Sequence, residues 1–278
     1  MSAPSLRVTG LFIYPVKSLR GFAVPAAEID ELGFVGDRRF LVIDDTGKFL
    51  TQRTHPRMAL IATALSATAL TLSTDDGRAP LSVLRATDPA APLRPVSVWK
   101  SEGLLAEDCG DAASAWLSDF LKISARLVRA GEKYHRPVKP SAAKPGDVVS
   151  FADAHPFLLI SEASLADLND RLAEKSEDAL PMDRFRPNIV VDGCGAFAED
   201  AWTHVRVGEI LFRNSGPCAR CIMTTTNQLT AERGKEPLRT LASYRRDASD
   251  PTDVNFGINL NHETKHGTVR VGDVVTPL

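Results

Sequence analysis

The pattern of apolar and polar positions predicts a mainly β protein with a few helices. Asp45-Thr46-Gly47 separates two runs of β-forming residues and has the composition of a compact hairpin turn. Other runs alternate polar and apolar residues, as a strand with one buried face does. The strand-like runs lie at 6–14, 39–44, 48–51, 67–73, 188–191, 205–213 and 267–273.

Two stretches have helical spacing instead. From 111 to 121 the apolar residues recur every three or four positions, and a second helix is expected to begin at Ser161, whose hydroxyl can cap it. Between these helices, residues 130–150 hold three prolines and little periodicity, which is typical of a loop. For a chain of 278 residues we therefore expect two packed domains, 1–128 and 129–278, with the boundary within about 125–150.

The composition and net charge of the chain limit the binding partners and the cellular compartment that we expect. A net charge of −2 and a pI near 6.3 give no broad cationic surface, so neither nucleic acid nor a membrane surface is an expected partner. The longest charge-free run, 58–74, carries six hydroxyl side chains, and no membrane span is expected. The first ten residues lack the apolar core of a signal peptide, and four cysteines are too few for a disulfide framework. We therefore expect reduced thiols in a cytoplasmic protein.

Cys218 and Cys221 form a Cys-x-x-Cys after the predicted strand that ends near residue 213. A structural zinc site would need two more ligands, and the remaining cysteines and histidines are scattered. A thioredoxin-like redox pair would open a helix, whereas residues 222–226 have an extended pattern. The third interpretation is two small buried residues beside a turn. The motif alone leaves all three open.

Three further fragments place a cation or an amide at the end of a predicted strand. They are Lys17-Ser18 after Tyr14-Pro15-Val16, Gly36-Asp37-Arg38, and Phe185-Arg186-Pro187-Asn188. Lysine and arginine beside a serine hydroxyl can hold a phosphate through charge-assisted hydrogen bonds. An asparagine amide can bind the donor and acceptor edge of a heterocycle. Each of these side chains can equally be a solvated charge, an ion-pair partner or a turn residue.

Taken together, these fragments and Cys218-Ala219-Arg220-Cys221 follow the order and approximate spacing of a known family. From about residue 6 to 275 the chain resembles MOSC-domain molybdenum cofactor proteins with a β-barrel N-terminal domain, and among them the mitochondrial amidoxime-reducing components. The resemblance implies a β-barrel N-terminal domain packed on a MOSC β-barrel domain, an α+β arrangement that is mainly β. It also implies a molybdopterin cofactor clamped between the two domains.

The resemblance carries residue roles onto this sequence. In the family the second cysteine of the Cys-x-Arg-Cys segment binds molybdenum and is catalytic, and here that residue is Cys221. The lysine, serine and arginine of the first domain hold the cofactor's phosphate. Cys218 is not required as a ligand. The positions implied to contact the cofactor are Lys17, Ser18, Arg38, Ala154, His155, Arg186, Asn188, Ala219, Arg220 and Cys221, of which Ala154 and His155 differ in residue type from the family pattern.

The implied chemistry suits the residue types. Molybdenum held by a dithiolene takes a soft thiolate as a further ligand, and Arg220 is expected to favour the ionised form of Cys221 if its guanidinium points inward. The resemblance implies an oxidoreductase that removes the oxygen atom from a small N-hydroxylated substrate, an amidoxime or a hydroxylamine.

Electrons are expected from a separate protein. The chain has no Gly-x-Gly-x-x-Gly fingerprint and no four-cysteine cluster pattern, so we predict a cytochrome b5-like or ferredoxin-like partner with its own reductase. Two alternatives remain at this point. The chain is a molybdenum cofactor carrier or sulfur-transfer module without reductase activity, or a zinc-stabilised interaction protein built around Cys218 and Cys221.

Overall fold

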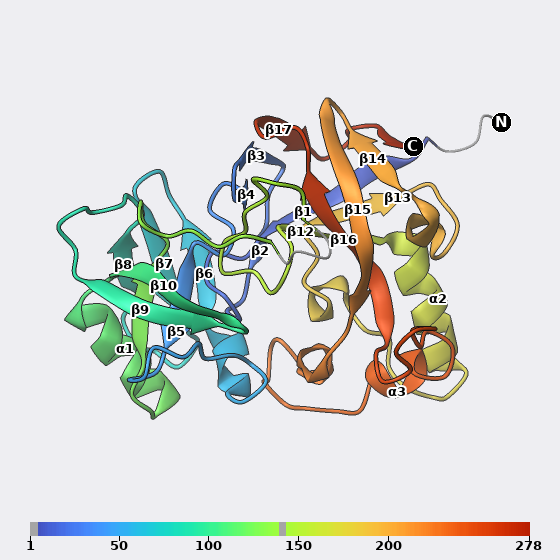
Figure 1. The fold of residues 1–278 in the computed structure, drawn as a ribbon. Helices are drawn as coiled ribbons and strands as arrows, with labels where there is room; N and C mark the ends of the chain where they lie inside the picture. The colour runs from blue at the N-terminus through green and yellow to red at the C-terminus, as the bar shows by residue number, and fades with distance from the viewer. Residues whose placement is uncertain (1–4, 139–142) are drawn as a thin grey trace.

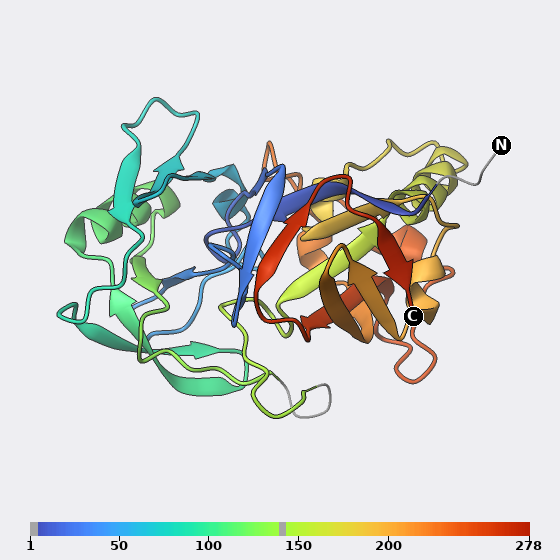
Figure 2. The ribbon, with the colours of Figure 1, turned by 90° about the horizontal axis from the view of Figure 1, so that it is seen from above.

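A computed structural model describes residues 5–138 and 143–278 of the chain. Strands predominate in these ranges, which hold three α-helices, so the prediction of a mainly β protein with a few helices is confirmed. Figures 1 and 2 show two lobes side by side. One lobe contains α1 (Asp111–Leu121), and the other contains α2 (Glu162–Ala173) and α3 (Leu238–Leu241).

The lobe with α2 is built on an eight-stranded sheet. Its strands are antiparallel apart from one parallel pair, β12 with β13. In spatial order they are β18 (Val275–Pro277), β14 (His204–Val207), β15 (Ile210–Ala219), β16 (Asn255–His262), β12 (Phe157–Ser161), β13 (Ile189–Asp192), β1 (Arg7–Ile13) and β2 (Phe22–Ala23). A three-stranded sheet beside it consists of β17 (Gly267–Arg270), β3 (Ala26–Asp30) and β4 (Gly33–Phe34).

The lobe with α1 holds two smaller antiparallel sheets. The four-stranded one has β5 (Phe40–Ile43), β11 (Arg126–Arg129), β10 (Ser101–Asp108) and β9 (Leu93–Val98) in spatial order. The three-stranded one has β6 (Ala62–Leu65), β7 (Ala69–Ser73) and β8 (Leu81–Leu84). Short 3₁₀ helices complete the described elements: η1 (Pro56–Leu60), η2 (Met182–Arg184), η3 (Ala198–Ala201) and η4 (Ile222–Thr225).

Local sequence explains where the two longer helices start and stop. The hydroxyl of Ser161 accepts a hydrogen bond from the backbone N–H of Ser164 and so caps α2, as predicted. Helix α1 buries Ala113, Leu117 and Phe120 on one face, and it ends where Lys122 adopts a left-handed conformation. Both helices therefore cover the apolar faces of their lobes.

The two lobes do not coincide with the sequence ranges before and after residue 128. Strand β1 pairs with β13, and β3 pairs with β17, so the first thirty-odd residues lie in the sheets of the second lobe. Their side chains Val8, Leu11 and Ile29 share one core cluster with Phe212 and Leu260. The N-terminal strands therefore connect the two lobes. The domain boundary within 125–150 stays a prediction.

Two local expectations differ from the structure. Strand β15 continues to Ala219 rather than ending near residue 213, so Cys218 lies within the strand and Cys221 just beyond it. Residues 222–225 form the 3₁₀ helix η4 rather than an extended segment, because Thr224 and Thr225 turn back onto the carbonyls of Cys221 and Ile222. The predicted loop at 130–150 holds one isolated bridge, Pro137 with Val148, among its described residues; 139–142 lie outside them.

Candidate functional site

All ten residues that were expected to contact a cofactor line one cavity of about 520 Å³. They reach it from the ends of β1 and β15 and from the segments that precede β5, β12 and β13. The first lobe adds Arg53 and Trp99, which the sequence did not single out. The cavity is therefore assembled from segments far apart in the chain, and both lobes contribute to its wall.

The ring of Tyr14 contacts two arginines of the cavity wall. The guanidinium groups of Arg38 and Arg186 lie 4.4 and 4.3 Å from the centre of its ring, close enough for cation–π attraction. Burial raises the pKa of Tyr14 well above its usual range, so its hydroxyl stays protonated and donates to the carbonyl of Pro187 at 3.0 Å. Tyr14 thus fixes the two arginines relative to each other.

A second set of contacts orients Arg38. Its Nη1 donates to Asp37 at 2.6 Å and to Oδ1 of Asn188 at 2.9 Å. The amide of Asn188 also accepts from the N–H of Leu158 and donates to the carbonyl of Phe12. These bonds fix the amide of Asn188 beside Arg38, and the expectation that Asn188 binds a heterocycle edge stays a prediction.

Several residues of the cavity wall have a positive φ angle, which is unusual for residues other than glycine. Among the described residues, eight that are not glycine have a positive φ, and four of them line the cavity: Ser18, Arg38, Trp99 and Arg186. Such conformations cost on the order of 1 kcal/mol each and persist where the surrounding fold enforces them. Strained conformations gathered in one cavity wall are typical of a binding site.

Lys17 and Arg53 both form ion pairs with Asp153. Lys17 is buried, donates to the carbonyl of Phe151 at 2.9 Å and pairs with Asp153. Asp153 also accepts from Arg53 and from the Trp99 indole, both at 3.1 Å. Burial alone would raise the pKa of Asp153, but Lys17 and Arg53 hold it well below its usual range. Asp153 directly precedes the predicted pair Ala154-His155, and that position was its only sequence signal.

Buried Arg136 arranges the loop that carries Asp153. Its guanidinium donates to the carbonyls of Ser150, Ala152 and Asp153 at 2.5 to 3.1 Å. This residue belongs to the segment that was predicted only as a loop between domains. Three carbonyls gathered on one guanidinium explain why the loop holds a defined position beside the cavity.

The two thiols of the Cys-x-x-Cys have different surroundings. Arg220 donates to the sulfur of Cys218 at 3.0 Å and to the carbonyl of Phe185, and the expectation that it supports Cys221 stays a prediction. Arg53 lines the same cavity as Cys221 and interacts with it electrostatically. Burial would lower the pKa of Arg53, but Asp153 and the Cys221 sulfur raise it. Sequence alone could not find this contact, because Arg53 lies in the other lobe.

The charge and hydrogen-bonding state of the cavity suit an anionic, thiolate-bound group. Nη1 of Arg53 and Nε of Arg220 are buried and have no hydrogen-bond partner within the described ranges. Unpaired buried donors of this kind call for an acceptor from outside the chain. The cavity's cations are Lys17, Arg38, Arg53, Arg184, Arg186 and Arg220, against the one carboxylate of Asp153.

No group of three or more His, Cys, Asp or Glu side chains that could hold a metal ion occurs in the part of the chain that the structure describes. The zinc alternative requires such a group of ligands. A cofactor that brings its own sulfur ligands and takes one thiolate from the protein does not.

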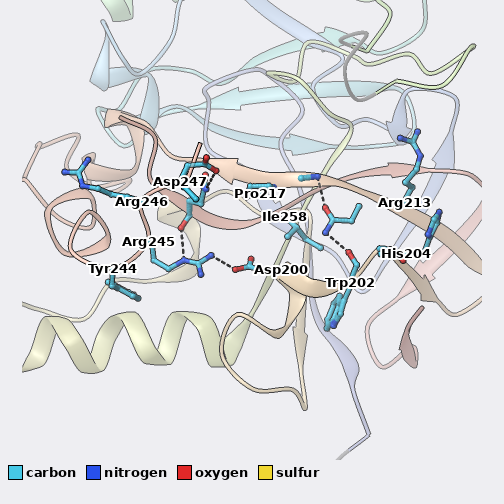
Figure 3. A pocket seen from close by; sticks show the side chains of 15 residues that line it. Asp200, Trp202, His204, Arg213, Pro217, Tyr244, Arg245, Arg246, Asp247 and Ile258 are labelled. Carbon is cyan, nitrogen blue, oxygen red and sulfur yellow. Dashed lines mark hydrogen bonds and ion pairs between the residues drawn. The ribbon is translucent and has the colours of Figure 1, made fainter. Parts of the chain in front are cut away.

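A second pocket of about 630 Å³ lies along β15 and β16 and shares only Pro217 with the first. Figure 3 shows that its polar side chains already bind one another: Arg245 pairs with Asp200 at 2.5 Å, and Asn255 donates to Asp247 at 2.8 Å. It contains none of the residues predicted to contact a cofactor. It is the weaker candidate because it lacks the cysteine and the excess of cations that the first cavity has, although the buried hydroxyl of Tyr244 in its lining has no hydrogen-bond partner in the described ranges.

Each half of the chain matches a known domain family. Residues 5–124 match the MOSC N-terminal beta barrel domain, and residues 146–276 match the MOSC domain. The chain is 40% identical to mitochondrial amidoxime-reducing component 1 of Mus musculus, over 96% of this chain and 81% of that protein. This chain belongs to the amidoxime-reducing component family. The human component 1 and the Bos taurus component 2 of this family are each 37% identical to it, over 96% of the chain and 82% of each protein.

Family membership corrects the expected compartment. The relatives are named mitochondrial, so the prediction of a cytoplasmic protein is wrong. That prediction rested on reduced thiols, which do not distinguish the cytoplasm from other reducing compartments. In the described ranges, no helix has both the length and the apolar character needed to cross a bilayer.

Proposed function

We propose that this chain is a molybdenum-cofactor oxidoreductase that reduces N-hydroxylated compounds such as amidoximes and hydroxylamines. The observation that carries the proposal is the single cavity that unites Cys221 with Lys17, Ser18 and Arg38. Its unpaired buried donors and excess of cations support an anionic cofactor, and the family supports the identity of that cofactor.

The residues take distinct roles in this proposal. Lys17, Ser18 and Arg38 would hold the cofactor's phosphate, Arg186 and the Ala219-Arg220 segment would contact the pterin, and Cys221 would bind the metal. Ala154 and His155 would lie beside it, and Asn188 would act by orienting Arg38. When bound, the cofactor supplies a two-electron redox centre that can take the oxygen from an N–O bond.

Arg53 and Asp153 hold fixed charges next to Cys221. Asp153 is ionised, so it serves to orient Lys17 and Arg53 rather than to donate a proton. Arg53 keeps one buried nitrogen free to donate to an anionic oxygen or sulfur near the thiolate. The chain thereby provides a preorganised cationic wall on the first-lobe side of the cavity.

We propose a separate electron carrier, cytochrome b5-like or ferredoxin-like, because the described residues hold no group of ligands for a second redox metal. The proposed activity is tested by supplying benzamidoxime and a chemical reductant, reduced methyl viologen, to the chain loaded with cofactor. We expect benzamidine as the product. A loaded chain that binds the cofactor but does not turn over benzamidoxime or a hydroxylamine would instead be a carrier or sulfur-transfer module.

Cofactor retention should fall as the pH rises through the range in which Lys17 loses its proton. Burial lowers the pKa of Lys17 to about 8, although Asp153 partly offsets this. A bound phosphate favours the ammonium form, so the loss should set in somewhat above pH 8, as a charge-assisted bond worth about 1–3 kcal/mol disappears. Pterin retained after gel filtration at pH 7.5 and 9.5 measures this.

The matched control for this pH dependence is Lys17→Met. The variant should retain less pterin at both pH values and show no step between them, because it has no titrating amine. A step of the same size in Lys17→Met would assign the pH dependence to another group.

A further inference from the structure

Three exposed apolar side chains lie in the cavity wall or in a segment that continues from it. Among the large hydrophobic residues that the described ranges expose, Leu229 is 71% exposed, Ile222 46% and Trp99 43%. Trp99 lies in the turn between β9 and β10, Ile222 directly follows Cys221, and Leu229 is in the loop 226–233. Single exposed apolar residues are ordinary, but a group with a polar rim marks an interaction site.

Hydrogen bonds and a cation–π contact join these segments through residues 52–53. Arg53 lies over the Trp99 ring at 4.5 Å, and Gln52 and Gln228 exchange two hydrogen bonds of 3.0 Å. Arg233 donates to the carbonyl of Arg53 at 2.7 Å. In Figure 1 the orange segment before α3 reaches the blue segment of the first lobe below the middle of the molecule. We call residues 52–53, 99–102 and 222–235 the docking face.

The docking face is cationic although the whole chain carries a net charge of −2. Lys100 and Lys235 are exposed, and Arg233 donates to backbone carbonyls instead of a carboxylate. Asp153 pairs with Arg53, and the remaining charged residues of the face are Lys100, Arg233 and Lys235 against Glu102 and Glu232. A local excess of this sign attracts acidic partners and speeds their encounter.

This face also adjoins the proposed metal ligand. Ile222 is the next residue after Cys221, and Arg53 interacts with the Cys221 sulfur from within the face. A protein seated over Ile222 would therefore contact the residue that follows the proposed metal ligand. Electron transfer between proteins requires such proximity of the donor to the acceptor site.

From these observations we infer that the docking face binds an acidic electron-carrier protein, the donor that the proposed function needs. This inference rests on that function. The carrier gives up one electron at each encounter, and two encounters supply the electron pair that, with two protons, converts N–OH into N–H and water. Small contacts steered by charge are typical of such transient redox pairs.

The test compares two electron donors on the loaded enzyme. The donors are a reduced acidic carrier, either the soluble haem domain of cytochrome b5 or a [2Fe–2S] ferredoxin, and reduced methyl viologen. The variants are Leu229→Glu and Lys235→Glu, with Leu84→Glu on β8 as the matched control, because Leu84 is 69% exposed and outside the face. With the carrier, kcat/KM should fall about tenfold, or ~1.4 kcal/mol, in the two face variants and stay unchanged in Leu84→Glu.

With methyl viologen, all three variants should match the parent, since none of the substituted residues lines the cavity. Equal carrier kcat/KM in Leu229→Glu, Lys235→Glu and Leu84→Glu would overturn the inference. So would a parent enzyme that methyl viologen reduces but neither acidic carrier does. A parent enzyme that fails with methyl viologen as well would overturn the proposed function itself.

Discussion

Replacing Cys221 with serine should reduce benzamidoxime turnover by at least about a thousandfold, or ~4 kcal/mol of barrier. A serine hydroxyl is a hard, largely protonated oxygen, whereas molybdenum in a dithiolene environment takes a soft thiolate. Cys221 and Arg53 line the same cavity, and loss of the Cys221 sulfur removes the one protein ligand proposed for the metal. Turnover with reduced methyl viologen measures the effect without a carrier protein.

Cys218→Ser is the matched control for that substitution. Cys218 accepts a hydrogen bond from Arg220 and packs against the core below α3, and a serine oxygen can accept the same bond. We expect its metal content to match that of the parent and its turnover to remain within a few-fold. Equal loss of metal in Cys218→Ser and Cys221→Ser would mean that the second cysteine is not the distinguishing ligand.

Arg38→Ala should have the second-largest effect, and it should act on both stability and cofactor content. Asp37 and Arg38 form a nearly buried ion pair, with 2% and 12% of their side chains exposed. Removing the cation leaves a buried carboxylate without its partner, which costs about 3 kcal/mol or more. Urea unfolding of the cofactor-free chain measures the first effect, and bound pterin per chain measures the second.

A double variant separates the two roles of Arg38. In Asp37→Asn with Arg38→Ala, the amide oxygen can still accept the N–H of Tyr14, and no charge is left unpaired. Stability should partly recover while the pterin content stays low, because the phosphate contact is not restored. The control pair is Arg129 and Glu107, which are similarly buried in the first lobe. Arg129→Ala should destabilise the chain but leave the pterin bound; recovery of pterin in the double variant would contradict a phosphate contact by Arg38.

Much of the secondary structure could be predicted because it depends on local pattern. Helix α1 has the bounds that its apolar spacing predicts, and Ser161 caps α2 as its position before a periodic segment indicates. Segment 222–225 was mispredicted because its β-branched residues favour a strand, while two threonine hydroxyls bond to carbonyls three residues back.

The list of cavity residues could also be predicted, but the contacts among them could not. Resemblance supplied ten positions, and all ten line the cavity. Pairings such as Arg53 with Cys221, or Lys17 with Asp153, depend on how the two lobes meet, which neither periodicity nor spacing encodes. The same holds for Tyr14, which looked like a strand residue and proved to be the platform for Arg38 and Arg186.

The metal content of the purified chain tests the central claim most directly. Elemental analysis of the wild-type chain, expressed with molybdenum and zinc both available, should find molybdenum approaching one atom per chain, accompanied by pterin, and little zinc. In Cys221→Ser the molybdenum should fall far below that level, and in Cys218→Ser it should not. Stoichiometric zinc with no molybdenum in the wild-type chain would contradict the account and favour a zinc-stabilised protein instead.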